Sequence, residues 1–307
     1  MKSDLFRPKE LKKTDKVALV APSGPSYDSV NLIFSINYLR RLGFFVWEGQ
    51  SCHSLYGYLA GNDRLRADDL NQAFADQTVA GIFCLRGGYG AARILDLLDF
   101  DIIRANPKFF CGYSDITALH NAFNQRAGFM TFHTPVVGEA SFPNADDFTL
   151  DSMNKYVFQE GIGGEVVNPI GYEWEFLTIG AAEGMLTGGN LSVMASLIGT
   201  AYEVDTAGKI LFIEDVGEKP YRIDRMLNQL AMAGKFADCA GVVFGDFTDC
   251  APTNPARSLS IRQIISNLGL KVPVLYNLCC GHCLPSLSLP LGAAVRLDSF
   301  TNSFRIL

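Results

Sequence analysis

A single serine lies where a buried strand ends and a helix begins. The segment Gly112-Tyr-Ser-Asp-Ile-Thr117 follows the apolar run Phe109-Phe-Cys. Such a turn exposes the Ser114 hydroxyl at a sheet edge and places free helix N–H groups beside it, which suits a nucleophile with an oxyanion site. The turn departs from the G-x-S-x-G pattern, because Ile116 stands where the second glycine would be. A serine before a helix is also a common cap, so the local sequence leaves both roles open.

Three glycines follow another strand in the segment Arg86-Gly-Gly-Tyr-Gly90. Because glycine has no Cβ, such a loop can bring its backbone N–H groups close to a ligand. The loop lacks the third glycine of a dinucleotide fingerprint and the Lys-Ser/Thr of a P-loop. An oxyanion donor or a tight turn is therefore favoured over a nucleotide site.

Two carboxylates, Glu214 and Asp215, lie at the end of the apolar run that closes at Ile213. Side chains alternate along a strand, so only one of the two can serve a given site. Either residue could instead be a solvated loop carboxylate or a partner of the helix that Pro220 begins.

The chain has four histidines. His53 lies in a polar loop and His120 lies within a predicted helix, which favours structural roles. His133 follows a short apolar strand and is a candidate for the site, as is His282. The latter stands between Cys280 and Cys283, a C-x-x-C spacing that suggests a metal, but no second ligand pair of that spacing exists.

Composition excludes several other classes of protein. The 307 residues suggest two domains, and 48% hydrophobic against 19% charged residues excludes a disordered chain. The net charge of −6, with no Lys/Arg run, argues against nucleic acid as a partner. No apolar stretch approaches the roughly 20 residues of a membrane span. The polar start predicts no export signal, so we expect a cytoplasmic protein whose eight cysteines are reduced.

Apolar runs alternate with helix-like stretches over residues 1–140. Continuous apolar strands separated by helices predict a parallel sheet covered on both faces. From 141 to 183 the pattern decays into Pro, Gly, Asn and acidic residues, which indicates a linker and loop. A second α/β unit occupies 184–307 and ends in a predicted hairpin. The predicted strands are 16–22, 44–47, 79–85, 109–112, 184–187, 209–213 and 240–244, and the predicted helices are 30–42, 63–75, 91–98, 115–125, 191–198 and 221–233.

Taken together, these segments resemble the LD-carboxypeptidases of the serine peptidase S66 type, which include murein tetrapeptide carboxypeptidases and microcin-C-immunity carboxypeptidases. The stretches lie in the family's order over nearly the whole chain, so the match is specific. They are Leu85-Arg-Gly-Gly-Tyr-Gly90, Gly112-Tyr-Ser-Asp115, Gly188-Gly-Asn-Leu191, Ile213-Glu-Asp215 with Pro220-Tyr-Arg-Ile-Asp224, and Gly281-His282 with Leu289-Pro-Leu-Gly292.

The resemblance implies a flavodoxin-like N-terminal α/β domain, a C-terminal domain of the swivelling β/β/α type, and an active site at their interface. It implies Ser114 as nucleophile, His282 as general base and Glu214 as the carboxylate that orients it. The oxyanion would be held by the N–H groups of Asp115 and of Gly88 or its neighbour Gly87. No metal or cofactor is implied, and members are usually homodimers.

The implied substrate is the murein stem tetrapeptide, from which the terminal D-Ala is released in cell-wall recycling. A carboxypeptidase must recognise a free carboxylate, and Arg86 and Arg222 are candidates for this by position. An alternative is the immunity-type hydrolysis of peptidyl or aminoacyl nucleotides, with Tyr172 and Trp174 available to stack on a base. A non-catalytic module that binds cell-wall peptide is a third possibility, and His133 stays open as the base.

Overall fold

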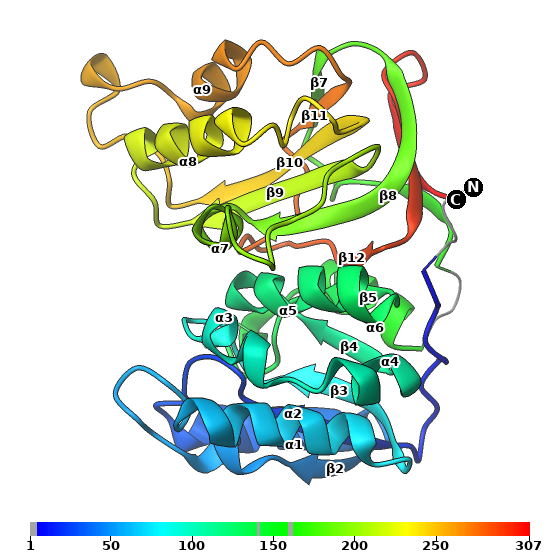
Figure 1. Ribbon diagram of the computed structural model, residues 1–307. Helices are drawn as coiled ribbons and strands as arrows, with labels where there is room; N and C mark the ends of the chain where they lie inside the picture. Colours follow the sequence, from blue (N-terminus) through cyan, green and yellow to red (C-terminus); the bar gives the residue numbers. More distant parts are fainter. Residues whose placement is uncertain (1–4, 140–141, 159–161) are drawn as a thin grey trace.

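The computed structural model describes residues 5–139, 142–158 and 162–307. Figure 1 shows two α/β parts stacked on one another, with the first half of the chain below and the second half above. The strands are β1 (Lys16–Val20), β2 (Phe45–Glu48), β3 (Val79–Cys84), β4 (Phe109–Gly112), β5 (Thr131–His133), β6 (Gly164–Val166), β7 (Glu175–Thr178), β8 (Ala181–Asn190), β9 (Ile210–Val216), β10 (Gly241–Thr248), β11 (Val274–Tyr276), β12 (Leu289–Leu291), β13 (Ala294–Asp298) and β14 (Ser303–Ile306). The α-helices are α1 (Ser29–Arg41), α2 (Asp63–Ala75), α3 (Ala91–Ile94), α4 (Phe100–Ala105), α5 (Thr117–Ala122), α6 (Asp147–Val157), α7 (Leu191–Leu197), α8 (Pro220–Met232) and α9 (Ile261–Asn267).

The first sheet has the strand order β12-β5-β4-β3-β1-β2, in which β1 to β5 are parallel. The order 2-1-3-4-5 is that of a flavodoxin-like doubly wound sheet. Alternate residues of β1 face opposite sides, because Val17 and Leu19 pack with α1 whereas Ala18 and Val20 pack with α2. The continuous apolar runs thus follow from burial on both faces, and the expected parallel α/β sheet is confirmed.

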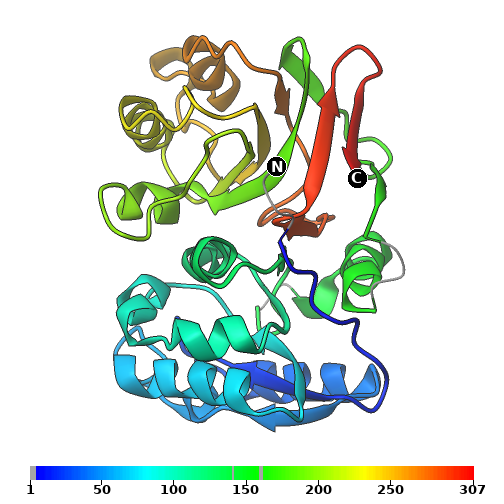
Figure 2. The same cartoon turned by 45° about the vertical axis from the view of Figure 1, so that its right-hand side comes forward.

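The second sheet has the order β6-β14-β13-β8-β9-β10-β11-β7. Its centre, β8 to β11, is parallel, and antiparallel strands lie at both edges. Strands β13 and β14 form the expected hairpin. Helices α7, α8 and α9 cover one face through an apolar core that includes Leu191, Leu227 and Ile264. Figure 2 shows these helices on the side of the sheet away from the β13–β14 hairpin.

The two halves are joined by more than a linker. Strand β12 comes from the second half of the chain but pairs antiparallel with β5 of the first sheet, Leu289 opposite His133. One buried apolar cluster includes Phe132 from the first half and Leu186 and Phe212 from the second. The pairing of β12 with β5 and this shared cluster therefore fix the two halves against each other at one edge of the first sheet.

The segment 141–183 is more regular than its composition indicates. Among its described residues, α6 packs Met153 and Tyr156 into the core, and β6 and β7 form the two edges of the second sheet. Residues 141 and 159–161 of this predicted linker and loop lie outside the described residues. Within the described ranges, none of the helices combines the length and apolar character needed to cross a bilayer.

Candidate active site

Ser114 lies at the carboxyl end of β4 on a sharp turn. Its φ of 61° is in the left-handed region, which side chains other than glycine rarely adopt. The expected continuous helix is instead a 3-10 turn, Ser114–Ile116, that leads into α5. The turn thus places the serine between an extended Tyr113 and the start of a helix, as expected from the sequence. In other hydrolases such a strained strand-to-helix turn exposes a nucleophilic hydroxyl.

Gly87 packs directly against this serine. A Cβ built on Gly87 would lie 2.7 Å from Ser114 Cβ and 3.0 Å from Ser114 Oγ, so a larger residue would displace the hydroxyl. The same Cβ would lie 3.4 Å from the backbone nitrogen of Asp115. The buried Asp115 carboxylate accepts a hydrogen bond from Ala91 N at 2.7 Å, which ties the serine turn to the helix after the glycine loop. Both predicted oxyanion segments therefore meet at Ser114.

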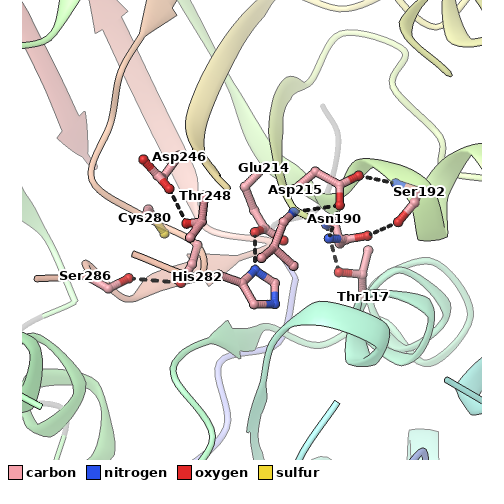
Figure 3. A network of polar contacts seen from close by, with 12 residues as sticks. Thr117, Asn190, Ser192, Glu214, Asp215, Asp246, Thr248, Cys280, His282 and Ser286 are labelled. Atoms are coloured by element: carbon pink, nitrogen blue, oxygen red, sulfur yellow. Dashed lines mark hydrogen bonds and ion pairs between the residues drawn. The ribbon is translucent and has the colours of Figure 1, made fainter. Parts of the chain in front are cut away.

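Glu214 and His282 form a hydrogen-bonded pair in the second half of the chain. Figure 3 shows the two side chains pointing toward one another, with His282 Nδ1 2.8 Å from Glu214 Oε2. Glu214 is fully buried near the carboxyl end of β9. Gly281, with φ 134°, allows this approach, because a Cβ there would lie 2.7 Å from Glu214 Oε2. The residue before the histidine therefore has to be small.

The environment of His282 keeps its imidazole basic. Burial would lower the pKa of His282, but the Coulombic attraction and hydrogen bond of Glu214 outweigh it. Glu139 and Asp215 add smaller contributions, and the pKa is raised above its ordinary value of 6.5. With Nδ1 bonded to a carboxylate, Nε2 is the nitrogen left to exchange protons with a substrate or hydroxyl.

Tyr113 joins the two halves of the site. Its ring packs against the imidazole of His282 in a tilted arrangement, with centroids 4.5 Å apart and planes inclined by 31°. Because Tyr113 directly precedes Ser114, this contact brings the serine turn of the first half to the Glu214–His282 pair of the second. A tyrosine within a turn carries no recognisable signal in the sequence, and this contact was not expected.

A buried polar chain runs beside the site. Figure 3 shows Thr117, Asn190, Ser192 and Asp215 in a connected group to one side of His282. Asn190 N donates to Thr117 Oγ1 at 2.9 Å, and Asn190 Nδ2 donates to Asp215 Oδ1 at 3.2 Å. Asp215 Oδ2 accepts from Ser192 N at 2.9 Å. The two carboxylates of β9 thus serve different purposes, Glu214 toward His282 and Asp215 toward the start of α7.

His133 lies deep beside the site but in an apolar setting. It is 1% exposed, and its ring makes edge contacts with Tyr113 at 6.0 Å and Phe212 at 5.1 Å between centroids. Among the described residues neither ring nitrogen has a hydrogen-bond partner. Burial holds the pKa of His133 well below its ordinary value, and the nearby imidazoles of His120 and His282 lower it further.

The two predicted arginines lie in different settings. Arg86 adjoins Gly87, donates to Pro25 O at 3.0 Å and lies 5.7 Å from the centre of the Tyr27 ring. It lines a surface hollow of about 390 Å³ together with Gly24, Pro25, Tyr27, Tyr58, Gly88 and Tyr89. Arg222 is exposed on α8, where it pairs with Glu218 at 3.4 Å. Its described contacts connect it to neighbours on its own segment rather than to Ser114 or His282.

Burial disfavours the thiolate form of the three cysteines near His282, because it raises the pKa of Cys279, Cys280 and Cys283. Burial raises the pKa of Cys280 well above its ordinary value, and Cys280 Sγ donates to Leu287 O at 3.2 Å. All eight cysteines lie in the described ranges and are free. In the same ranges, no group of three or more His, Cys, Asp or Glu side chains is arranged to hold a metal ion.

Comparisons with known proteins identify the family of this chain. A protein-family model for the LD-carboxypeptidase N-terminal domain matches residues 17–134. A second family model, for the LD-carboxypeptidase C-terminal domain, matches residues 183–297. A probable murein peptide carboxypeptidase of Bacillus subtilis (strain 168) is 41% identical over 305 residues, covering 96% of this chain and 92% of the relative.

Two solved structures are similar over nearly their whole length. An MccF-like protein from Bacillus anthracis str. Ames has a TM-score of 0.89 and 28% identity, covering 98% of this chain and 99% of the other. A muramoyltetrapeptide carboxypeptidase from Oxalobacter formigenes has a TM-score of 0.81 and 28% identity, covering 95% and 97%.

The fold and these matches define a two-domain α/β hydrolase of the serine peptidase class. The chain belongs to the LD-carboxypeptidase family, peptidase family S66. It is therefore an enzyme rather than a binding module, and the resemblance drawn from its motifs is confirmed.

Proposed function

We propose that this enzyme releases the terminal D-Ala from the murein stem tetrapeptide by cleaving the amide bond after the L-centre of its diamino acid. The observation that carries the proposal is the Glu214–His282 pair packed on Tyr113, the neighbour of Ser114. The murein names of the similar Bacillus subtilis and Oxalobacter formigenes proteins support this choice of substrate.

The proposed mechanism is acyl transfer through Ser114. His282 Nε2 takes the hydroxyl proton as Oγ attacks the scissile carbonyl carbon, and Glu214 stabilises the imidazolium. The N–H groups of Asp115 and of Gly88 or Gly87 hold the oxyanion, and losing one such donor typically costs about 10²–10³ in rate. The imidazolium then protonates the leaving amine. Water attacks the acyl-enzyme with His282 again as base, restoring the serine.

His282 suits the role of base better than His133. A general base must accept a proton and keep the resulting charge, and His282 has Glu214 at 2.8 Å for this purpose. His133 lies 5.1 Å from Phe212 between ring centroids, with a lowered pKa, so a charge on it would be costly.

Arg86 is the arginine that the geometry favours for the terminal carboxylate. It directly precedes Gly87, which packs against Ser114, so Arg86 lies in the same glycine loop that is proposed to hold the oxyanion. A leaving D-Ala carries its carboxylate one residue from the scissile carbonyl, and a guanidinium fork suits that group. Arg222, paired on the surface of α8, is the weaker candidate. The homodimer, the cytoplasmic site of action and the role in cell-wall recycling belong to the same proposal.

The test is D-Ala release from purified muropeptide tetrapeptide, followed by liquid chromatography and mass spectrometry. We expect release by the wild type and loss of release in Ser114→Ala. A tetrapeptide ending in an amide tests the carboxylate requirement and should be cleaved poorly. A covalent serine probe should label the wild type but not Ser114→Ala, and labelling that persists would remove Ser114 from the mechanism.

A second substrate class is favoured by one observation, the similarity to the MccF-like protein over 98% of this chain. In this alternative the same residues would hydrolyse the amide of a peptidyl or aminoacyl nucleotide. The candidate stacking residues differ in availability, because Tyr172 is about half exposed whereas the Trp174 indole donates to Asn302 Oδ1 at 3.1 Å. Comparing turnover of the tetrapeptide with that of a peptidyl-adenylate mimic separates the two substrates.

A further inference from the structure

The orientation of the His282 ring needs more than its hydrogen bond to Glu214. One hydrogen bond, from Nδ1 to Oε2, fixes a single point of the ring and leaves rotation about that axis open. General-base catalysis requires Nε2 to point at the serine hydroxyl within hydrogen-bond reach. A second contact, on the face of the ring, would therefore fix the plane of the imidazole more narrowly than the backbone attachment and this hydrogen bond do.

The Tyr113 ring is placed to set that plane. It is 5% exposed and lies against the imidazole at 4.5 Å between centroids, with the two planes tilted by 31°. Its other neighbour is His133, whose ring meets it edge-on at 84° and 6.0 Å. Tyr113 and His282 also line one narrow hollow, whose walls include Val136, Phe142 and Leu284. The tyrosine ring is thus in contact with both imidazoles and belongs to a buried apolar cluster that includes Val136.

Chain connectivity makes this contact specific. The backbone of Tyr113 leads directly into Ser114, so the residue that delivers the nucleophile also carries the surface on which the base rests. Aromatic rings in such contact gain about 0.5–1.5 kcal/mol beyond their burial, and a π face attracts a cation. The imidazolium formed during acylation is such a cation.

We propose that Tyr113 is a positioning residue, whose ring sets the plane of the His282 imidazole so that Nε2 faces the Ser114 hydroxyl. The same ring face stabilises the imidazolium once the proton has moved. This inference rests on the Ser114–His282 mechanism proposed above, but it does not depend on which peptide is the substrate.

The experiment compares three variants. Tyr113→Leu removes the ring, and Tyr113→Phe keeps the ring and removes the hydroxyl. Phe142→Leu is the matched control, because it makes a similar ring-to-leucine change in a wall of the same hollow, where Phe142 packs on Tyr38 with centroids 5.0 Å apart.

The first measurement is the pKa of His282 in the enzyme without substrate, by NMR titration of the imidazole, with His282→Gln to assign its signal among four histidines. The two Tyr113 variants remove the titratable hydroxyl of Tyr113, but the other charged and titratable groups around His282 are the same in all three variants, namely Glu214, Glu139, Asp215, Asp246 and His133. We expect Tyr113→Leu to lower the pKa of His282 by about 0.5–1 unit. Tyr113→Phe and Phe142→Leu should leave it unchanged.

The second measurement is the rate of Ser114 labelling by a covalent serine probe, together with kcat and KM for D-Ala release. Since a misplaced base typically costs about 10²-fold, we expect Tyr113→Leu to lower the labelling rate and kcat by about 10–10²-fold. KM should change by less than about threefold, because ground-state binding does not use this contact. If the wild type labels but does not cleave the tetrapeptide, the substrate proposal fails while the labelling and titration still decide the role of Tyr113.

Either of two results would overturn the inference. One is a folded Tyr113→Leu variant with the wild-type pKa of His282 and the wild-type labelling rate. The other is Tyr113→Phe losing as much as Tyr113→Leu, which would assign the effect to the hydroxyl. If Tyr113→Leu does not fold, Tyr113→Met replaces it in both measurements with the same expected results.

Discussion

Replacing the buried carboxylate that holds the base gives the sharpest test of the proposed mechanism. In Glu214→Gln the side chain keeps its shape but loses its charge. The amide can donate to Nδ1 instead of accepting from it, which would put the imidazole proton on the wrong nitrogen. Glu214 Oε1 has no described hydrogen-bond partner that would hold the amide in the useful orientation. The corresponding change in a Ser-His-Asp protease lowers kcat about 10⁴-fold, so we expect a loss of about 10³–10⁴ here.

The pH dependence of the same variant has a defined sign. In the wild type the carboxylate raises the pKa of His282 above 6.5, so the acid limb of the kcat/KM profile should lie above that pH. In Glu214→Gln the main remaining influence is burial, which lowers the pKa of a histidine. The acid limb should therefore move below pH 6.5. The assay is D-Ala release between pH 5 and 9.

Asp215→Asn is the matched control, because it is the same carboxyl-to-amide change on the next residue of β9. Asp215 bonds to Asn190 and Ser192 rather than to His282. We expect its kcat to remain within about tenfold of the wild type. Two results would refute the reasoning: a Glu214→Gln variant that keeps a tenth of wild-type kcat with an unmoved acid limb, or an Asp215→Asn variant that loses as much.

Three further perturbations follow from single contacts. Gly87→Ala places a methyl group 2.7 Å from Ser114 Cβ, so kcat should fall at least about 10²-fold. A folded variant with the wild-type kcat would contradict the packing of Gly87 against Ser114. Asn121→Ala removes two buried hydrogen bonds between α5 and β8, at 3.3 Å to Gly188 N and 3.4 Å to Gly188 O. It should lower the free energy of unfolding, measured by urea titration, by about 1–3 kcal/mol. An unchanged free energy of unfolding would argue against a stabilising contact between the halves. Burial and the charge of Glu214 raise the pKa of Asp215 from 3.8 to about 6, so folding favours its protonated form. As the pH rises from about 4 to about 6, the free energy of unfolding of the wild type should therefore fall by about 3 kcal/mol relative to that of Asp215→Asn. Identical pH slopes for the two proteins in urea unfolding would contradict this shift.

Elements with a strong internal pattern could be predicted from the sequence closely. Helix α2 and strand β4 have the predicted bounds, Asp63–Ala75 and Phe109–Gly112. Each carries its own signal, because α2 places apolar residues on one side and β4 is a continuous apolar run buried on both faces. The parallel α/β class follows from such elements alternating along the chain.

Elements that depend on distant partners could not be predicted in this way. Strands β6 and β7 have three or four residues, mostly half-exposed, and gain their structure from pairing with β14 and β11. Strand β12 is the short segment Leu-Pro-Leu, and nothing local indicates that it pairs with β5 more than 150 residues earlier. Short edge strands lack the apolar alternation on which the sequence argument relies.

For the candidate site, too, local features could be predicted from the sequence and contacts between distant segments could not. The types and motif positions of Ser114, Glu214 and His282 could be read from the sequence because their segments resemble a family. The contact that brings the segments together could not, since it is made by Tyr113 and depends on how the halves pack. The sequence offers Arg86 and Arg222 by position alone, whereas the fold packs Gly87, the residue after Arg86, against Ser114 and leaves Arg222 paired on α8.

The hydrogen bonds between the halves indicate that the proposed nucleophile and base are held in register before substrate binds. Thr117, three residues after Ser114, accepts from Asn190 N, and the Asn190 side chain donates to Asp215, the neighbour of Glu214. The side chains of Thr117, Asn190 and Asp215 are buried, so moving one half of the protein against the other would leave these donors and acceptors without partners. Each such group costs about 1–3 kcal/mol, and the Tyr113–His282 ring contact would be lost as well. Closure by a large domain movement is therefore disfavoured, and substrate should bind to a site whose serine turn and imidazole–carboxylate pair are already assembled.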